Sequence, residues 1–194
     1  MLRAPRRVLV PVARGSEDIE VSCLTDVLRR ASFDVTLASI EDTRDVVLAR
    51  GLHVIADSLL SDVVANSASA PFDVIALPGG MPGAERLRDC APLVSLLREQ
   101  RADGRWIAAI CAAPAVVLAA HGLLDGVASV TCYPSFAHAL PRGCASEERV
   151  VVNETSRVIT SRGPGTAIEF ALQIVAVLDG KACADKISEA MLLR

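Results

Sequence analysis

Three absences narrow the function before any motif is considered. Aromatic residues make up only 3% of the 194 residues, two residues are lysine, and the formal net charge is −3. The chain therefore lacks the basic stripe and the aromatic stacking platform that proteins use to hold nucleic acids. We expect no nucleic-acid partner.

Metal-binding and disulfide patterns are missing as well. None of the six cysteines forms a CxxC pair, and the three histidines fit no zinc spacing. A chain that is 52% hydrophobic can build its core without disulfides. We therefore expect reduced cysteines, no cofactor and a cytoplasmic location.

The length and the hydrophobic content predict one domain spanning residues 1–194.

Residues 1–7 carry three arginines, but the apolar run 8–13 is too short for a signal peptide; a brief organellar presequence is the alternative. Residues 106–124 have no formal charge and reach the length of a membrane helix, yet they contain Pro114 and Gly122. Two buried elements joined by a turn explain them better, and we expect no membrane partner.

Short apolar runs alternate with segments of helical periodicity. Ser16 is predicted to cap the first helix, with Glu17 and Asp18 as solvated charges and Ile19 on the apolar face. The predicted strands are 7–13, 34–39, 73–77, 105–110 and 127–132; the hairpins are 46–49 with 53–56 and 149–153 with 158–161; the later helices are 57–65, 92–103, 112–120, 166–178 and 181–193.

This alternation predicts an α/β fold, a mostly parallel sheet with helices on both faces. Ligands of such folds bind at the carboxyl ends of the strands. The segments 15–20, 77–80, 110–114 and 132–134 are therefore expected to form the site.

Cys111 follows a predicted strand directly, and Pro114 opens the next helix. This places the thiol on a sharp strand-to-helix turn like the nucleophile elbow of hydrolases, where a helix N-terminus lowers a thiol pKa. A buried structural cysteine is the alternative. Gly79 and Gly80 end another strand, so the N–H of Gly80 and that of Ala112 are candidates to bind an oxyanion.

Glu20 lies one turn into the first helix, near the same sheet edge, and its apolar neighbours indicate that it leans inward. A carboxyl buried among apolar groups has a raised pKa and can carry protons for a thiolate. Taken alone, Glu20 would be interpreted as a surface residue.

Five segments together resemble the ThiJ/PfpI superfamily, most closely the branch of the Parkinsonism-associated protein deglycase and its bacterial relatives. They are VPVARGSEDIE at 10–20, RDVV at 44–47, LPGG at 77–80, AAICAAP at 108–114 and TSRGPGT at 160–166. They cover essentially the whole chain. The resemblance implies a flavodoxin-like three-layer sandwich, a homodimer, a nucleophilic and oxidation-prone Cys111, and a protonated Glu20 bonded to its sulfur.

The resemblance also implies roles for residues other than Cys111 and Glu20. Arg44 and Arg162 match arginines near the site or the dimer contact, and Pro164 matches a pocket-lining residue. Some members have histidine where Tyr133 stands in this chain. Since tyrosine is a poor base at neutral pH, a cysteine–histidine dyad is not expected, and Tyr133 is expected only to line the substrate site.

The function implied is cofactor-free detoxification of small dicarbonyls, methylglyoxal to lactate and glyoxal to glycolate, with deglycation of glycated proteins ranked second. The alternative from another functional class is a redox sensor or chaperone in which Cys111 becomes oxidised. A cysteine hydrolase is disfavoured because no histidine is followed two residues later by glutamate. A thiazole or thiamine role has no phosphate-binding loop to support it.

Overall fold

A seven-stranded sheet forms the centre of the computed structural model, which describes residues 4–66 and 71–193. The strand order is β5-β2-β1-β6-β7-β9-β8. Neighbouring strands are parallel except for β8 and β9, which form an antiparallel edge hairpin. The predicted mostly parallel α/β sheet is thus confirmed.

The strands are short and the central ones are buried. Their bounds are β1 (Arg7–Val12), β2 (Asp34–Ser39), β5 (Ser58–Leu59), β6 (Val74–Leu77), β7 (Trp106–Ile110), β8 (Val150–Asn153) and β9 (Val158–Ser161). A separate antiparallel hairpin consists of β3 (Asp45–Val47) and β4 (His53–Ile55). Every residue of β6, β7 and β9 is buried, because a parallel sheet covered on both faces needs continuous apolar strands.

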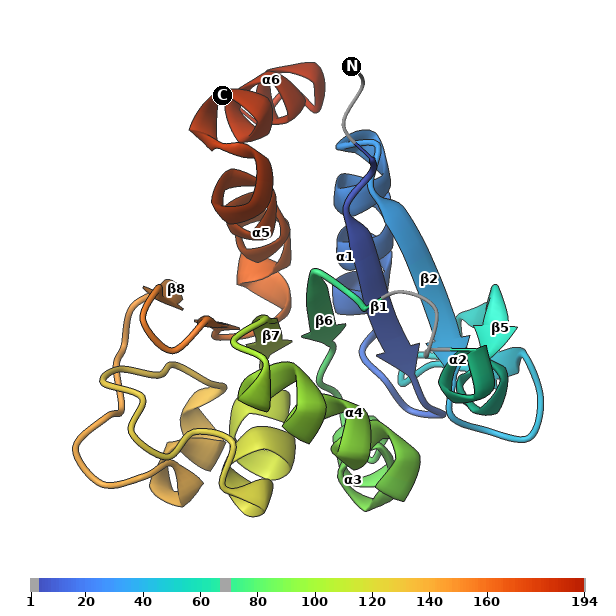
Figure 1. Cartoon of the computed structure of the whole chain (residues 1–194), viewed down its shortest axis with the longest axis horizontal. Helices are drawn as coiled ribbons and strands as arrows, with labels where there is room; N and C mark the ends of the chain where they lie inside the picture. The colour runs from blue at the N-terminus through green and yellow to red at the C-terminus, as the bar shows by residue number, and fades with distance from the viewer. Residues whose placement is uncertain (1–3, 67–70, 194) are drawn as a thin grey trace.

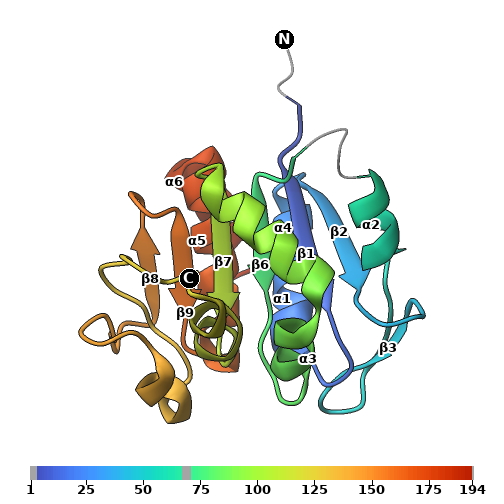
Figure 2. The ribbon, with the colours of Figure 1, turned by 60° about the horizontal axis from the view of Figure 1, so that its bottom comes forward.

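Helices cover both faces of the sheet, as Figure 2 shows: α4 crosses in front of β6 and β1, while α1 and α5 lie behind. The helices are α1 (Asp18–Arg30), α2 (Leu60–Asn66), α3 (Gly83–Asp89), α4 (Ala91–Ala102), α5 (Ala167–Asp179) and α6 (Lys181–Ala190). Figure 1 shows α5 and α6 following one another at the C-terminal end. Within the described ranges, no helix combines the length and hydrophobicity needed to span a bilayer.

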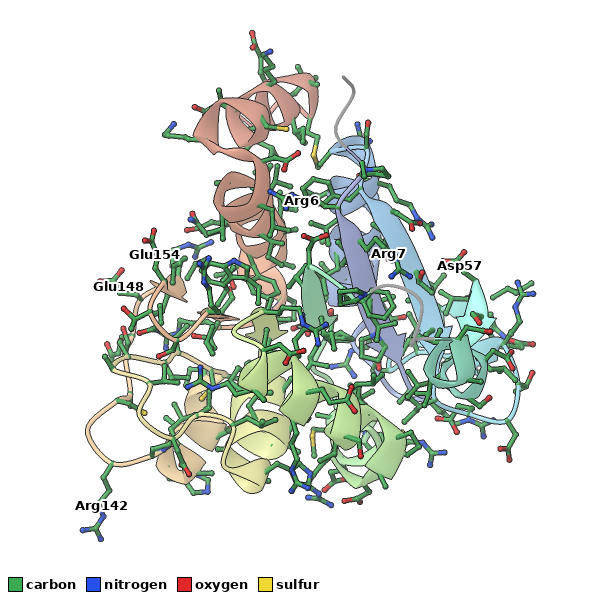
Figure 3. The ribbon with its side chains drawn as sticks, in the orientation of Figure 1. Arg6, Arg7, Asp57, Arg142, Glu148 and Glu154 are labelled. Carbon is green, nitrogen blue, oxygen red and sulfur yellow. The ribbon has the colours of Figure 1, made fainter. Side chains whose placement is uncertain are left out.

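The start of β1 is anchored by Arg6, labelled with Arg7 in Figure 3. The Arg6 guanidinium lies 3.0 Å from Asp73 before β6 and 2.8 Å from Asp179 at the end of α5. One side chain therefore joins three elements at the edge of the sheet opposite the predicted site. Residues 1–3 of the segment considered as a presequence lie outside the described residues.

At the opposite edge of the sheet, where the site is predicted, the turn before α1 and the turn before α3 are in close contact. Gly83 begins α3 directly against the turn that leads into α1, and a Cβ on Gly83 would lie 2.4 Å from the backbone nitrogen of Ser16. Gly15 has φ +82°, and a Cβ there would lie 2.7 Å from Pro82 Cδ. These glycines let two backbones meet where side chains would collide.

Several predicted elements differ from the observed ones. Residues 127–132 form no strand: Val130 makes a single bridge to Ala145, and the next N–H, that of Thr131, bonds the Thr160 hydroxyl instead of a ladder carbonyl. The predicted helix 112–120 consists of a π-helical turn, Pro114–Leu118, and a 3-10 turn, Ala119–His121. The sequence patterns missed α3, β5 and the 3-10 helix Pro134–Ala139.

The start of the first helix also differs from the prediction. Its cap is Glu17, whose carboxylate accepts the N–H of Glu20 at 2.8 Å, because the Ser16 hydroxyl is engaged by the N–H of Ala13. Glu17 is buried rather than solvated, whereas Ile19 is 52% exposed although it was predicted to face the core. The helix therefore begins at Asp18, one residue later than a cap at Ser16 predicts.

We expect Gly83→Ala to lower the free energy of unfolding by about 1–3 kcal/mol, since the added methyl group must displace the Ser16 backbone. Alanine favours helices more than glycine does, so a loss of stability would identify the close contact as its cause. Urea denaturation measures the difference. The control is Gly165→Ala, where no atom lies within 4 Å of the new Cβ and we expect a change within about 0.5 kcal/mol; equal stabilities of the two variants would contradict the interpretation.

Candidate active site

Cys111 occupies a strained turn at the carboxyl end of β7. Its φ is +64°, a left-handed conformation that residues other than glycine rarely adopt. Two hydrogen bonds hold it there: its N–H donates to the Ser161 carbonyl at 2.9 Å, and its carbonyl accepts the Tyr133 N–H at 2.8 Å. The sharp turn predicted from the sequence is present, and strain of this kind is common at functional sites.

The Gly79–Gly80 loop after β6 packs directly against this turn. A Cβ on Gly79 would lie 2.7 Å from Cys111 Cβ and 2.8 Å from the Ala112 nitrogen, so a larger residue would push the two loops apart. The N–H groups of Gly80 and Ala112 both hydrogen-bond the Cys111 sulfur. The two donors predicted for an oxyanion thus converge on the sulfur itself.

Glu20 is fully buried beside them, on the first turn of α1. Its Oε2 accepts the Gly79 N–H at 2.7 Å. Its Oε1 is equally buried and has no partner in good hydrogen-bond geometry among the described residues, and the side chain that interacts with the carboxyl is the Cys111 thiol. The predicted inward orientation of Glu20 is confirmed.

Burial raises the pKa of Glu20 to about 7. The Gly79 N–H and the Cys111 thiol act in the opposite direction, and the charge of Glu17 adds to the increase. Because the desolvation of a carboxylate is the larger effect, Glu20 exchanges its proton in the neutral range, as a general acid or base must.

The ionisation of Cys111 is coupled to that of Glu20. Burial raises the pKa of the thiol, and the negative charge of Glu20 raises it further, whereas the N–H groups of Gly80 and Ala112 lower it. The predicted lowering of the thiol pKa was therefore wrong, since burial, the largest cause, outweighs the two N–H groups. The contribution of the Glu20 charge disappears when the carboxyl is protonated.

The two acids consequently hold one negative charge between them. In the form in which Glu20 holds the proton, the donors to a charged sulfur are the N–H groups of Gly80 and Ala112. In the form in which Glu20 is charged, its Oε2 accepts the Gly79 N–H. The sulfur therefore carries the charge only while Glu20 is protonated.

Tyr133 and Gly163 lie on the outer side of the sulfur. A Cβ on Gly163 would be 3.2 Å from Tyr133 Cδ2 and 4.0 Å from Cys111 Sγ. Gly163 is buried, whereas Tyr133 is 45% exposed. The structure therefore places the Tyr133 ring beside Gly163, a residue near the sulfur that sequence reasoning missed although it lies within the TSRGPGT segment. The substrate-lining role of Tyr133 stays a prediction.

The other three residues implied by the resemblance are Arg44, Arg162 and Pro164, and each has surroundings of its own. Arg44 is exposed at the base of the β3–β4 hairpin and donates to the Ala56 carbonyl at 2.6 Å. Arg162 donates to the Glu147 carbonyl at 2.8 Å and lines a cavity of about 250 Å³ with Cys132. Their roles stay predictions.

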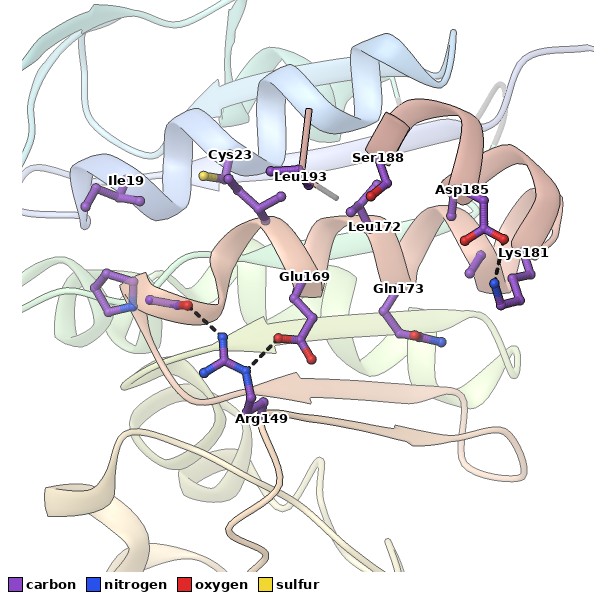
Figure 4. A pocket seen from close by; sticks show the side chains of 15 residues that line it. Ile19, Cys23, Arg149, Glu169, Leu172, Gln173, Lys181, Asp185, Ser188 and Leu193 are labelled. Carbon is purple, nitrogen blue, oxygen red and sulfur yellow. Dashed lines mark hydrogen bonds and ion pairs between the residues drawn. The ribbon is translucent and has the colours of Figure 1, made fainter. Parts of the chain in front are cut away.

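Pro164 lines a groove of about 760 Å³ bordered by α1, α5 and α6. Figure 4 shows Ile19 and Cys23 on one side of it, and Arg149 bonded to Glu169 at one end. The groove lies on the outer surface of these helices, and the predicted role of Pro164 at the substrate site stays a prediction.

No group of three histidine, cysteine or acidic side chains in the described part of the chain is arranged to hold a metal ion. The groups that the described residues bring to the site are a thiol, one buried carboxyl and three peptide N–H groups.

Comparison with known proteins places this arrangement in a family. The family model described as DJ-1/PfpI family matches residues 6–177. Protein DJ-1 homolog A of Arabidopsis thaliana is 43% identical over 189 residues, which are 97% of this chain and 47% of that protein. This chain thus spans about half the length of that plant relative.

Two further relatives match over most of their length. Glutathione-independent glyoxalase DJR-1.2 of Caenorhabditis elegans is 39% identical over 175 residues, 89% of this chain and 88% of that protein. The solved structure of oxidized DJ-1 from Toxoplasma gondii superimposes with a TM-score of 0.91 at 48% identity, covering 97% of this chain and 98% of that one. The chain therefore belongs to the DJ-1/PfpI family.

Proposed function

We propose that this protein is a cysteine-dependent, glutathione-independent glyoxalase, converting methylglyoxal to lactate and glyoxal to glycolate in the cytoplasm. The observation that carries the proposal is the pairing of the Cys111 thiol with a buried carboxyl, Glu20, whose pKa is about 7. The name of the nematode relative, a glutathione-independent glyoxalase, supports it.

The first step is attack of the Cys111 sulfur on the aldehyde carbon. A C–S bond forms, and the electrons of the C=O bond move to oxygen, which takes the proton held by Glu20. The product is a hemithioacetal, and Glu20 is left as a carboxylate. The N–H groups of Gly80 and Ala112 stabilise the sulfur before it attacks.

The second step moves a proton between neighbouring carbons. Glu20 removes the C–H proton from the hemithioacetal carbon while the neighbouring carbonyl oxygen takes a proton from water, which gives an enediol. Glu20 then returns its proton to the adjacent carbon while the first hydroxyl loses its proton to water, and the result is a thioester of lactate or glycolate on Cys111. Water hydrolyses the thioester to the hydroxy acid anion and the thiolate; of the two protons released, one returns to Glu20 and the other goes to solvent.

Deglycation of proteins ranks second, because Cys111 is only 8% exposed and a small aldehyde reaches such a sulfur more easily than a glycated side chain does. A redox sensor is the alternative from another class. The donors that stabilise a thiolate, Gly80 and Ala112, would also stabilise the oxygens of an oxidised sulfur.

We also propose that two copies of the chain associate through the groove of Figure 4. Two large apolar residues that line it are exposed, Ile19 at 52% and Leu193 at 41%, so they form part of one apolar surface. A second copy would cover Ile19 and Leu193, both of which line the groove.

Turnover of methylglyoxal should depend on one cysteine. We expect purified protein to form lactate without added glutathione and Cys111→Ala to abolish this, since no other group would form the C–S bond. Cys183→Ala, which removes a half-buried thiol on α6, is the matched control and should keep full activity. Lactate is measured enzymatically; an equally negligible rate in the native protein and in Cys111→Ala would instead favour the redox sensor.

Glu20→Gln should separate proton transfer from nucleophilicity. Glutamine keeps the size of a protonated carboxyl and an N–H donor for the sulfur, but it cannot carry a proton between carbons. We expect a loss of at least about 100-fold in kcat, while the rate of Cys111 alkylation by iodoacetamide changes by less than about tenfold. A kcat within a factor of about three of the native value would exclude Glu20 as the proton carrier.

Association through the groove is tested by Ile19→Glu, which places a charge on the proposed contact. Sedimentation velocity should show a dimer for the native chain and a monomer for the variant. Val64→Glu on α2, at the opposite face, is the control and should stay dimeric. A native protein that sediments as a monomer, or a variant that stays dimeric, would contradict this contact.

A further inference from the structure

Gly163 is required at its position by space and not by conformation. Its φ of 165° is extended backbone that any residue adopts. A Cβ at this position would nevertheless lie 3.2 Å and 3.8 Å from two carbons of the Tyr133 ring and 4.0 Å from the Cys111 sulfur. One methyl-sized point is therefore in contact distance of both the ring and the nucleophile.

Neither side of this narrow gap is free to withdraw. The Gly163 carbonyl accepts both the N–H and the hydroxyl of Thr166, at 2.8 and 2.9 Å, and the Thr166 hydroxyl is 2.6 Å from that of Ser161. On the other side, the Tyr133 N–H is bonded to the Cys111 carbonyl. Hydrogen bonds thus hold the backbone on both sides of the gap.

The ring also borders the approach to the sulfur. Glu20, Gly79, Ala112 and Gly163 around the sulfur are all buried, whereas Tyr133 is 45% exposed. Its ring leans against Phe136, with centroids 6.5 Å apart at 57°. Tyr133 is the most exposed residue of this group, which also includes the half-buried Gly80, so its ring is the part that a molecule from solvent meets first.

We propose that Tyr133 and Gly163, together called the lip, determine which carbonyl compounds reach Cys111. The lip admits compounds whose second substituent is hydrogen or methyl and excludes those with an aryl group. This rests on the proposed glyoxalase function for the identity of the substrate, but the steric claim concerns the sulfur itself. Ring carbons Cδ2 and Cε2 are the Tyr133 atoms that lie near Gly163, so we assign the exclusion of larger compounds to the ring and not to the hydroxyl.

The first test compares glyoxal, methylglyoxal and phenylglyoxal as substrates. We expect Tyr133→Ala to raise the ratio of kcat/KM for phenylglyoxal over glyoxal by about tenfold or more, the usual scale for steric selection in a pocket. Tyr133→Phe is the matched control and should keep the native ratio. A change of the ratio in Tyr133→Phe equal to that in Tyr133→Ala would overturn the assignment to the ring.

The second test does not require turnover. Methyl and benzyl methanethiosulfonate label the thiol, and mass spectrometry of the Cys111 peptide gives the two rates, each divided by the rate with free cysteine. Tyr133→Ala should raise the benzyl-to-methyl ratio by about tenfold, and Gly163→Ala should lower it. Circular dichroism verifies that both variants fold. If Gly163→Ala does not fold, the labelling ratio of Tyr133→Ala alone decides the test.

The two tests separate the lip from the proposed function. A native protein without dicarbonyl turnover, whose labelling ratio still rises in Tyr133→Ala, would refute the glyoxalase and support the lip. A labelling ratio within about twofold of the native value in Tyr133→Ala would overturn the lip, whatever the turnover.

Discussion

A single negative charge shared by two buried acids is the constraint on which the site depends. Glu20 is fully buried and Cys111 is 8% exposed, so ionising both would place two adjacent anions out of water. The three peptide N–H groups of Gly79, Gly80 and Ala112 are sufficient to stabilise one charge, and most of them face the sulfur. The site is thereby prepared to move one proton and to use one nucleophile, which is what the proposed isomerisation of a dicarbonyl requires.

The fold provides this pair by bringing together three loops at one edge of the sheet. The loop after β1 leads into the helix that carries Glu20, the loop after β6 supplies Gly79 and Gly80, and the loop after β7 carries Cys111. These three strands are adjacent in the sheet, in the order β1-β6-β7, so their carboxyl ends meet. Contacts that only glycine permits, at Gly79 and Gly83, let the loops approach closely enough for peptide N–H groups to reach side chains of a neighbouring loop.

Hydrophobic runs were sufficient to predict the buried strands and the edge at which the site lies, because burial on both faces dictates the sequence of a parallel strand. The same reasoning failed at residues 127–132, where Val127, Val130 and Cys132 are buried but the bridge from Val130 to Ala145 is the one strand-like pairing that the segment makes with the described residues. Glu17 was misjudged because an acidic residue before a helix has the same local pattern whether it is solvated or caps the helix from a buried position. Local sequence does not show which loop will cover it.

In the site itself, residue type and position in the fold were enough to propose Cys111 and Glu20, but not the sign of their mutual effect. That sign depends on desolvation and on the direction of individual N–H groups, which only the three-dimensional arrangement shows. Gly163 was missed because its importance lies in the space beside Tyr133, a contact between segments thirty residues apart.

The most direct test of the shared charge is a ¹³C NMR titration of the Glu20 carboxyl carbon in the native protein, assigned by its disappearance in Glu20→Gln. We expect the carboxyl to be mostly protonated at pH 6 and to titrate with a midpoint near pH 7, because its pKa is raised from 4.5 to about 7. A midpoint near 4.5 would show an ionised Glu20 throughout the neutral range and would contradict the account.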